Sequence, residues 1–272
     1  MKTLNNQTLL YDKDCPLCNA YTAGFIKAGM LDAHGRKPYT SLNETDCQFI
    51  DANRARNEIA LVDYKNKTVT YGIDSLLKVV GHSFPFIEKV GKVKPVYWFL
   101  KKLYSFISYN RKVIIPNKKQ DTALQCVPDF NFRYRMAYLI FSGLLTAVVL
   151  FKYAELIPHI PKSNFARELL LAFCQLPFQW LFIRKRDKQA QLNYFGNLMT
   201  VSLFGALLLL PMLITATFAE IPALITTGWF LVTAIIMLLE HIRRVRLLEL
   251  PVILCVTWVG YRVLALLVIL FV

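Results

Sequence analysis

The chain has 272 residues, of which 55% are hydrophobic and 18% charged, and its formal net charge is +14. A soluble domain has about 45–50% apolar and about 25% charged residues, so this composition excludes an ordinary soluble globule, and it also excludes intrinsic disorder and fibrous repeats. The apolar residues concentrate from about Tyr134 to Val272, whereas Met1 to Asp129 is a normal water-soluble mixture. The sequence therefore predicts two unlike parts.

The positive charge could indicate a nucleic-acid partner or a membrane protein. We expect no nucleic-acid partner, because the chain has no basic motif with interleaved base-stacking aromatics. Lysine and arginine are retained on cytoplasmic loops of membrane proteins, next to anionic lipid. The first 14 residues are polar and lack the apolar core of a secretory signal peptide, which predicts that the N-terminal part stays in the cytoplasm with its thiols reduced.

The first part shows alternating strand and helix patterns. Its apolar runs suit buried strands, its four-residue apolar spacing suits helices, and Lys65–Lys67 suits a hairpin turn between two β-rich runs. The predicted order is strand–helix–strand–helix–strand–strand–helix, which is that of an α/β thioredoxin-like fold with a small central sheet covered by helices. The predicted elements are strand 8–11, a helix from Cys15 to about Gly29, strand 37–41, helix 43–56, strands 59–64 and 68–71, and a helix capped by Asp74 and Ser75.

The segment from Phe84 to Ile115 alternates aromatic residues with lysines and is amphipathic. It therefore has two interpretations of equal weight: a helix on the membrane surface, or a helix packed on the sheet. We place the thioredoxin-like domain at residues 1–115 and a polar linker at 116–132.

Residues 133–272 read as an all-α transmembrane domain with about five helices, because a span needs about 20 predominantly apolar residues. The second candidate is the weakest, since it is short and contains Gln175, Pro177 and Gln179. The five candidates are Tyr134–Leu156, Phe165–Ile183, Tyr194–Phe218, Ile221–Glu240 and Pro251–Val272.

Loop charges support five spans. Basic clusters lie at Arg133 and Arg135, at 184–188 and at 243–246, whereas the loop with Glu220 has no lysine or arginine. Five spans with a cytoplasmic N-terminus place all three clusters inside, as the positive-inside rule requires. The sequence therefore predicts a multi-pass protein of the cell membrane whose N-terminal domain is cytoplasmic.

The stretch Cys15-Pro16-Leu17-Cys18 carries the most chemical information. A thiolate is the nucleophile of thiol–disulfide exchange, and a helix N-terminus lowers the pKa of a cysteine thiol. Pro16 suits the first turn, where its missing N–H is not needed. We therefore assign Cys15 as the attacking thiol and Cys18, one turn later, as the resolving thiol, with no cofactor beyond the redox-active dithiol.

The CxxC pattern has two other interpretations. It could be half of a structural zinc site, although neither a second CxxC nor a histidine pair is present, and Cys47, His34 and His82 are scattered. It could also be a scaffold turn without turnover. In either case the protein would be a non-catalytic membrane interaction or transport protein.

Residues 11–18, Tyr-Asp-Lys-Asp-Cys-Pro-Leu-Cys, resemble the signature of the DCC family, Asp-x-x-Cys-x-x-Cys, which falls here on Asp12, Cys15 and Cys18. Residues 59–63 and 71–77 are similar to the family's hairpin and Gly-x-Asp helix start, which makes Gly72 and Asp74 supporting residues. Residues 104–111 are similar to its closing Tyr…Asn-Arg element. The resemblance covers about residues 7–115 and implies a thioredoxin-like thiol–disulfide oxidoreductase.

Two carboxylates precede the cysteines. Asp12 reads equally as a proton acceptor for Cys18, and so as a catalytic residue, or as a turn former. For Asp14 we favour a structural role as the cap of the helix. In the apolar part, Arg262 lies near the middle of the last span, where a charge is costly, so we expect it to face protein or water as an intramembrane charge site, with Glu220 or Glu240 as partner.

Together these observations predict a membrane-anchored thiol–disulfide oxidoreductase with a CPLC dithiol on a cytoplasmic domain. Its expected partners are a protein or low-molecular-weight thiol or disulfide and the lipid bilayer.

Overall fold

The computed structural model describes all residues except 1, 43–47, 49, 117–128, 159 and 272. The chain divides into two compact units, unit 1 (Met1–Tyr134) and unit 2 (Arg135–Val272). Most of the predicted linker over 116–132 lies outside the described residues.

Unit 1 contains a four-stranded sheet in the order β2-β1-β3-β4. Strand β1 (Gln7–Tyr11) pairs in parallel with β2 (Arg36–Pro38) and antiparallel with β3 (Ala60–Asp63), which continues into an antiparallel hairpin with β4 (Thr68–Tyr71). Helix α1 (Pro16–Lys27) connects β1 to β2, and α3 (Ala52–Asn57) precedes β3. The predicted order of strands and helices is confirmed.

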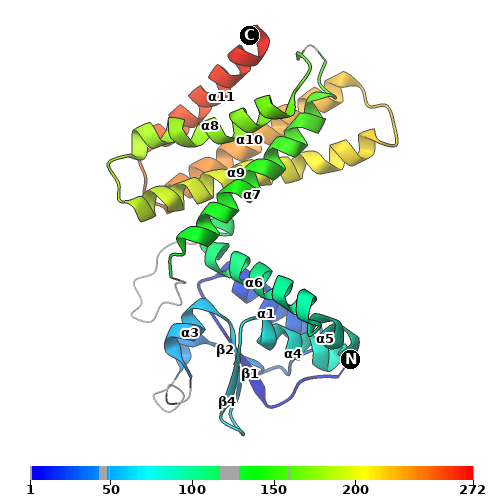
Figure 1. The fold of residues 1–272 in the computed structure, drawn as a ribbon, viewed down its shortest axis with the longest axis vertical. Helices are drawn as coiled ribbons and strands as arrows, with labels where there is room; N and C mark the ends of the chain where they lie inside the picture. Colours follow the sequence, from blue (N-terminus) through cyan, green and yellow to red (C-terminus); the bar gives the residue numbers. More distant parts are fainter. Residues whose placement is uncertain (1, 43–47, 49, 117–128, 159, 272) are drawn as a thin grey trace. The chain divides into compact units, whose positions relative to one another are not determined.

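Both faces of this sheet are buried because side chains alternate along each strand. Leu9 and Leu61 point into one cluster with residues of α1 and α4 (Ile73–Ser83), whereas Leu10 and Val62 point into the other with Ala55 of α3. Figure 1 shows α3 on one side of the strands and α1 and α4 on the other. The sheet is therefore the middle of three layers.

Two predicted elements differ from the structure. The predicted strand 37–41 is shorter, because β2 ends at Pro38 and a single 3-10 turn, η1 (Tyr39–Ser41), follows it. Of the predicted helix 43–56, only α3 is helical among the described residues. It begins after Asp51, whose carboxylate accepts a hydrogen bond from the N–H of Arg54.

The segment after the sheet forms α5 (Pro85–Gly91) and the long helix α6 (Lys94–Ile114). The inner face of α6 packs on the residues that lead into β3. The Tyr104 hydroxyl accepts the N–H of Ile59, and the Ser108 hydroxyl donates to the carbonyl of Asn57. The opposite face is exposed. The structure therefore shows packing on the domain and leaves an amphipathic outer face.

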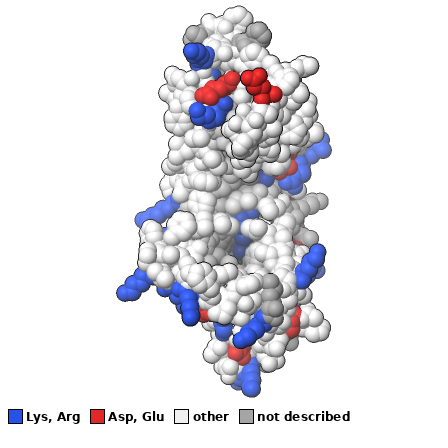
Figure 2. Space-filling model, turned by 90° about the vertical axis from the view of Figure 1, so that its right-hand side faces the viewer, with Lys and Arg blue, Asp and Glu red and all other residues white. Residues whose placement is uncertain are grey.

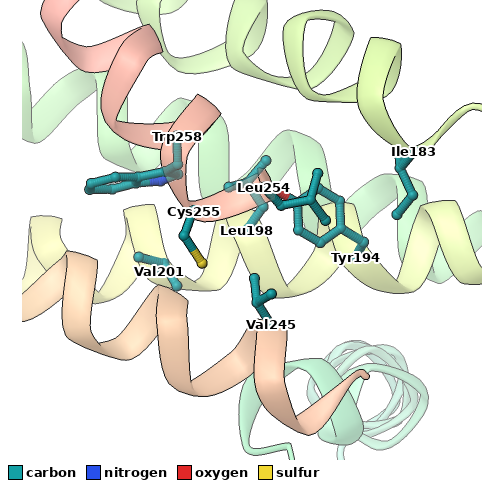
Figure 3. Packing of buried hydrophobic residues seen from close by; sticks show 8 residues of the cluster. All are labelled: Ile183, Tyr194, Leu198, Val201, Val245, Leu254, Cys255 and Trp258. Carbon is teal, nitrogen blue, oxygen red and sulfur yellow. The ribbon is translucent and has the colours of Figure 1, made fainter. Parts of the chain in front are cut away.

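The described residues of unit 2 form a bundle of helices α7 to α11, drawn in green to red in Figure 1. The contacts between α9 and α10 are the most extensive, and α8 packs against α11. The buried cluster in Figure 3 joins Ile183 of α8, Tyr194 and Leu198 of α9, Val245 of α10 and Trp258 of α11. On the face of unit 2 that Figure 2 shows, charged side chains form a few patches separated by broad uncharged surface. The helices are α7 (Phe132–Ala154), α8 (Phe165–Ile183), α9 (Lys188–Ala216), α10 (Ala223–Leu247) and α11 (Ile253–Phe271).

Within the part of the chain that the structure describes, four helices are long and apolar enough to cross a membrane: α7, α9, α10 and α11. The second predicted span does form α8, but this helix is not one of the four. Its sequence carries Arg167 and Glu168 in the first turn and Gln175 and Gln179 on its buried face, and these side chains lower its hydropathy.

Candidate functional site

The dithiol lies where β1 passes into α1, as predicted. Strand β1 ends at Tyr11, and the Asp12 carboxylate accepts the N–H of Asp14, which closes a short Asx turn. Cys15 is extended and caps the helix, and Pro16 occupies the first helical turn. The turn therefore aims Cys15 at the free N–H groups of the helix start.

The two cysteines face each other across this first turn. The Cys15 sulfur accepts the backbone N–H of Cys18 at 3.4 Å. Both thiols are free, and only 7% of Cys15 and 4% of Cys18 is exposed. The attacking sulfur is thus nearly covered, but it receives hydrogen bonds from Cys18.

The pKa values of the two thiols are shifted in opposite directions. A hydrogen bond from the Cys18 side chain lowers the pKa of Cys15 to about 6, with help from the Cys18 N–H and Arg111 and against the opposing effects of burial and Asp12. The hydrogen bond to Cys15, together with burial, raises the pKa of Cys18 far above its usual range. This is the division that an attacking thiolate and a resolving thiol require.

A buried arginine from the last turn of α6, far from the cysteines in sequence, completes the site. Arg111 of α6 lies 3.6 Å from the Asp12 carboxylate, and both side chains are nearly covered. Burial works against the Arg111 charge, but Cys18, Cys15 and Asp12 raise its pKa above the usual value. Burial raises the pKa of Asp12, and Arg111 partly offsets this effect. The guanidinium therefore supplies a fixed positive charge beside both thiols.

A small pocket opens next to Cys18. Its lining includes Asp12, Tyr21, Glu58 and Arg111 as well as Cys18. The Tyr21 hydroxyl hydrogen-bonds Cys18, and burial raises the pKa of Tyr21 well above its usual value, so this hydroxyl stays protonated. Asp12 and the resolving thiol thus share one pocket, which places a carboxylate near the proton that Cys18 has to lose.

The supporting residues predicted from the sequence have definite positions, and two roles change. Asp14 was predicted as the helix cap, and this is wrong: the Cys15 sulfur itself takes the N–H that a cap would accept. Asp74 was predicted to cap α4 with Ser75, and this is also wrong, because Gly72 caps that helix. Asp74 instead accepts a hydrogen bond from the Tyr97 hydroxyl of α6 at 3.0 Å.

Gly72 has a structural reason to be glycine. Its φ is +63°, a left-handed conformation that other residues rarely adopt, and an added Cβ would lie 3.0 Å from a carboxylate oxygen of Glu58. Its N–H donates to the carbonyl of Ile59, the residue that Tyr104 also contacts. Gly72 therefore fixes α4 beside the strand that faces the site.

The structure also tests whether other metal-binding side chains gather near the cysteines. Among the described residues, no group of three or more His, Cys, Asp or Glu side chains could hold a metal ion. Cys47 lies outside the described residues.

Arg262 lies apart from the thiol site, in unit 2. Its guanidinium donates to the Gln175 side-chain oxygen at 3.0 Å and lies 4.8 Å from the centre of the Trp258 ring. No ion pair of Arg262 is found among the described residues, and Glu240 pairs with Arg243 and Arg244 instead. The prediction of a carboxylate partner is therefore wrong. The prediction that Arg262 faces protein is confirmed, and its contacts there are the neutral side chains of Gln175 and Trp258.

Arg111 and Tyr21 are two site residues that the sequence pattern did not indicate as such. Arg111 was noted only as the end of the Tyr…Asn-Arg element, and that element was the available signal for it. Tyr21 recurs with Leu17 and Phe25 at four-residue spacing, and this pattern predicts core packing of the helix and gives no sign of a site residue.

Comparison with family models, with curated proteins and with solved structures gives no match for this chain. The functional interpretation therefore rests on the geometry around Cys15 and Cys18 and on the sequence pattern of residues 7–115.

Proposed function

We propose that unit 1 is a thioredoxin-like domain of the DCC type that performs thiol–disulfide exchange, and that unit 2 anchors it in the cell membrane. The observation that carries the proposal is the position of Cys15, which caps α1 with a pKa lowered to about 6 beside a protonated Cys18. The order of helices and strands and the sheet order β2-β1-β3-β4 support the fold assignment.

In the first step the Cys15 thiolate attacks a disulfide of the substrate. One S–S bond breaks, a mixed disulfide forms between Cys15 and one substrate sulfur, and the other substrate sulfur leaves as a thiolate. The positive charge of Arg111 stabilises the anionic sulfur before the attack, and the Cys18 N–H holds it in place.

In the second step Cys18 attacks the Cys15 sulfur. The Cys18 thiol first loses its proton, and we assign the Asp12 carboxylate, which lines the same pocket, as the acceptor. The new Cys15–Cys18 disulfide releases the second substrate thiolate. Two electrons pass from the dithiol to the substrate, and an external thiol reductant restores the dithiol.

The arrangement needs no cofactor beyond this dithiol. The chemistry fits partners that carry a thiol or disulfide, either a protein or a low-molecular-weight thiol. Because the pocket beside Cys18 is small and Cys15 is nearly covered, the reacting disulfide has to approach along the exposed edge of Cys15.

The membrane topology follows from charge. If α8 crosses the membrane as the other four helices do, the clusters around Arg135, Arg184 and Arg244 lie on one side together with unit 1. Without that crossing, the Arg184 cluster lies on the opposite side from Arg135. We therefore propose five crossings with unit 1 in the cytoplasm. Labelling of cysteines introduced at Arg133 and Lys185, which flank α7 and α8, with an impermeant reagent should show the same side, and labelling from opposite sides would refute this topology.

The activity is tested on the full chain in detergent with insulin or a glutathione mixed disulfide as substrate. We expect turnover by the native chain, none by Cys15→Ser, and a Cys15-linked adduct trapped in Cys18→Ser. Cys174→Ser, which removes an exposed cysteine of α8, is the matched control and should keep full activity. No turnover and no trapped adduct would favour the non-catalytic alternative, and stoichiometric metal lost in Cys15→Ser would identify that alternative as a metal site.

A further inference from the structure

The outer surface of unit 1 is apolar in one place. Among the described residues of this unit, every exposed Phe, Trp, Leu, Ile or Val lies between Phe84 and Ile115, apart from Phe132 at the start of α7. Elsewhere the surface of the unit carries no exposed side chain of this kind among the residues described. A water-facing domain rarely gathers its exposed apolar side chains on one segment without a partner for them.

This surface, which we call the α5–α6 face, has a defined composition. On α6, Phe99, Leu103 and Ile107 recur every fourth residue and so share one side of the helix. The side that holds Tyr104 and Arg111 points inward to the sheet and the thiol site. The remaining exposed members are Phe84, Phe86, Ile87 and Val90 in and before α5, Val93, Trp98 of α6 and Ile115.

The charged side chains around the α5–α6 face are predominantly positive. Lys89, Lys94, Lys101 and Lys102 are exposed, and none of them forms an ion pair among the described residues. The only acidic residue between positions 84 and 115 is Glu88, which pairs with Lys92. An exposed apolar face that holds aromatic residues and is ringed by unpaired lysines matches the boundary between anionic headgroups and acyl chains.

The chain connects this segment closely to a helix that could cross a membrane. Helix α6 ends at Ile114, and α7, the first helix long and apolar enough to cross a membrane, begins at Phe132. A short connection of this kind keeps unit 1 near the bilayer, where even a weak affinity for lipid is sufficient for docking.

We propose that the α5–α6 face is a lipid-binding surface, which lies on the anionic leaflet of the membrane that holds unit 2. Phe86, Trp98 and Phe99 enter the boundary of the acyl chains, and the four lysines contact lipid phosphates. This surface rests on the proposed membrane insertion of unit 2 and does not require the thiol chemistry. It has a consequence for that chemistry, because Arg111 lies on the same helix and the thiol site is thereby held close to the membrane surface.

The test is photocrosslinking in the full chain reconstituted in vesicles. The photoreactive residue p-benzoylphenylalanine replaces Phe86 or Phe99 in two separate variants. Val256, exposed on α11, is the positive control for lipid contact, and Lys65, exposed in the β3–β4 turn, is the negative control. We expect mass spectrometry to find lipid adducts at Phe86 and Phe99 at a yield near that of Val256 and well above that of Lys65.

Two outcomes overturn the proposal: a yield at the level of Lys65 at both positions, or adducts with a protein segment of the same or a second copy in place of lipid. The lipid charge is tested separately. Adducts at Phe86 should be several-fold more abundant in vesicles containing phosphatidylglycerol than in phosphatidylcholine alone. The variant with Gln at Lys89, Lys94, Lys101 and Lys102 should lose this difference. Equal yields in both vesicles with the native lysines would overturn the assignment to an anionic surface.

Discussion

Each unit of the molecule contains an arginine near polar groups, but the two arginines have different partners. Arg111 of unit 1 lies 3.6 Å from the Asp12 carboxylate and beside two thiols. The partners of Arg262 in unit 2 are neutral among the described residues: the amide oxygen of Gln175 and the ring of Trp258. The first arrangement can change the charge of a neighbour, because the surrounding groups titrate. The second holds no Asp or Glu among the described residues and fixes the packing of α8 against α11.

The comparison shows why burial of a charge is not by itself a sign of chemistry. A buried cation stabilises a thiolate only when the sulfur lies close enough to feel its charge. Arg111 meets this condition through Cys15. Arg262 has no such neighbour among the described residues, which makes it a contrast within the same chain.

The largest effect is expected from Arg111→Met. The change leaves the buried Asp12 carboxylate without its cation, and breaking a buried pair in this way costs about 3–5 kcal/mol of unfolding free energy. It should also raise the pKa of Cys15, because the arginine lowers it. Hydrogen exchange of the β1 and β3 amides measures the stability of unit 1 in the full chain. Lys102→Met, which removes an exposed cation from the same helix, should leave exchange unchanged.

The second largest effect is expected from Asp12→Asn, which gives Arg111 an amide partner of the kind that Arg262 has. In Asp12→Asn the amide oxygen still accepts the N–H of Asp14, so the loss should be smaller, about 1–3 kcal/mol. The pKa of Cys15 should fall, because the Asp12 charge raises it. Release of substrate from the mixed disulfide should slow, because Cys18 loses its proton acceptor. Shifts of the Cys15 pKa in the same direction in Asp12→Asn and Arg111→Met would contradict the assigned electrostatics.

The smallest effect is expected from Arg262→Met. The change removes one hydrogen bond to Gln175 but also the cost of burying a charge, so the stability of unit 2 should change by less than about 1 kcal/mol. Arg244→Met is the matched comparison, because it breaks a pair with Glu240 and a hydrogen bond with Asn197. Thermal unfolding in detergent should show the larger loss in Arg244→Met, and equal losses would refute the distinction between the two arginines.

Local patterns predicted the parts of the fold that local physics decides. Pro16 and the apolar spacing after it located the start of α1, and the β-rich runs around Lys65–Lys67 located the hairpin. The cap of α1 was assigned wrongly to Asp14, because a sulfur rarely takes the role of a capping oxygen. The fourth predicted span ends at Glu240, where apolarity stops, but a span boundary does not locate the end of the helix α10. The helix continues to Leu247, because arginines are good helix formers.

Contacts between distant segments could not be read from such patterns. Arg111 lies near the end of an amphipathic helix whose buried face reads as core packing, and nothing next to it in sequence indicates Asp12 as its partner. Likewise, charge alone predicts Glu240 as a partner for Arg262, but the Glu240 carboxylate pairs with Arg243 and Arg244 one turn away. The pairing of charges depends on which helix faces meet, and one sequence alone does not determine that.

The measurement that tests the central claim most directly is the pH dependence of Cys15 alkylation in the reduced full chain. Iodoacetamide reacts with the thiolate, and peptide mass spectrometry separates Cys15 from the other cysteines. Because the pKa is lowered, the thiolate forms as the pH rises through about 6, and the rate should be half-maximal there and nearly constant above about pH 7. A midpoint near the ordinary thiol value of about 8.5, or a Cys15 that does not react, would contradict the account.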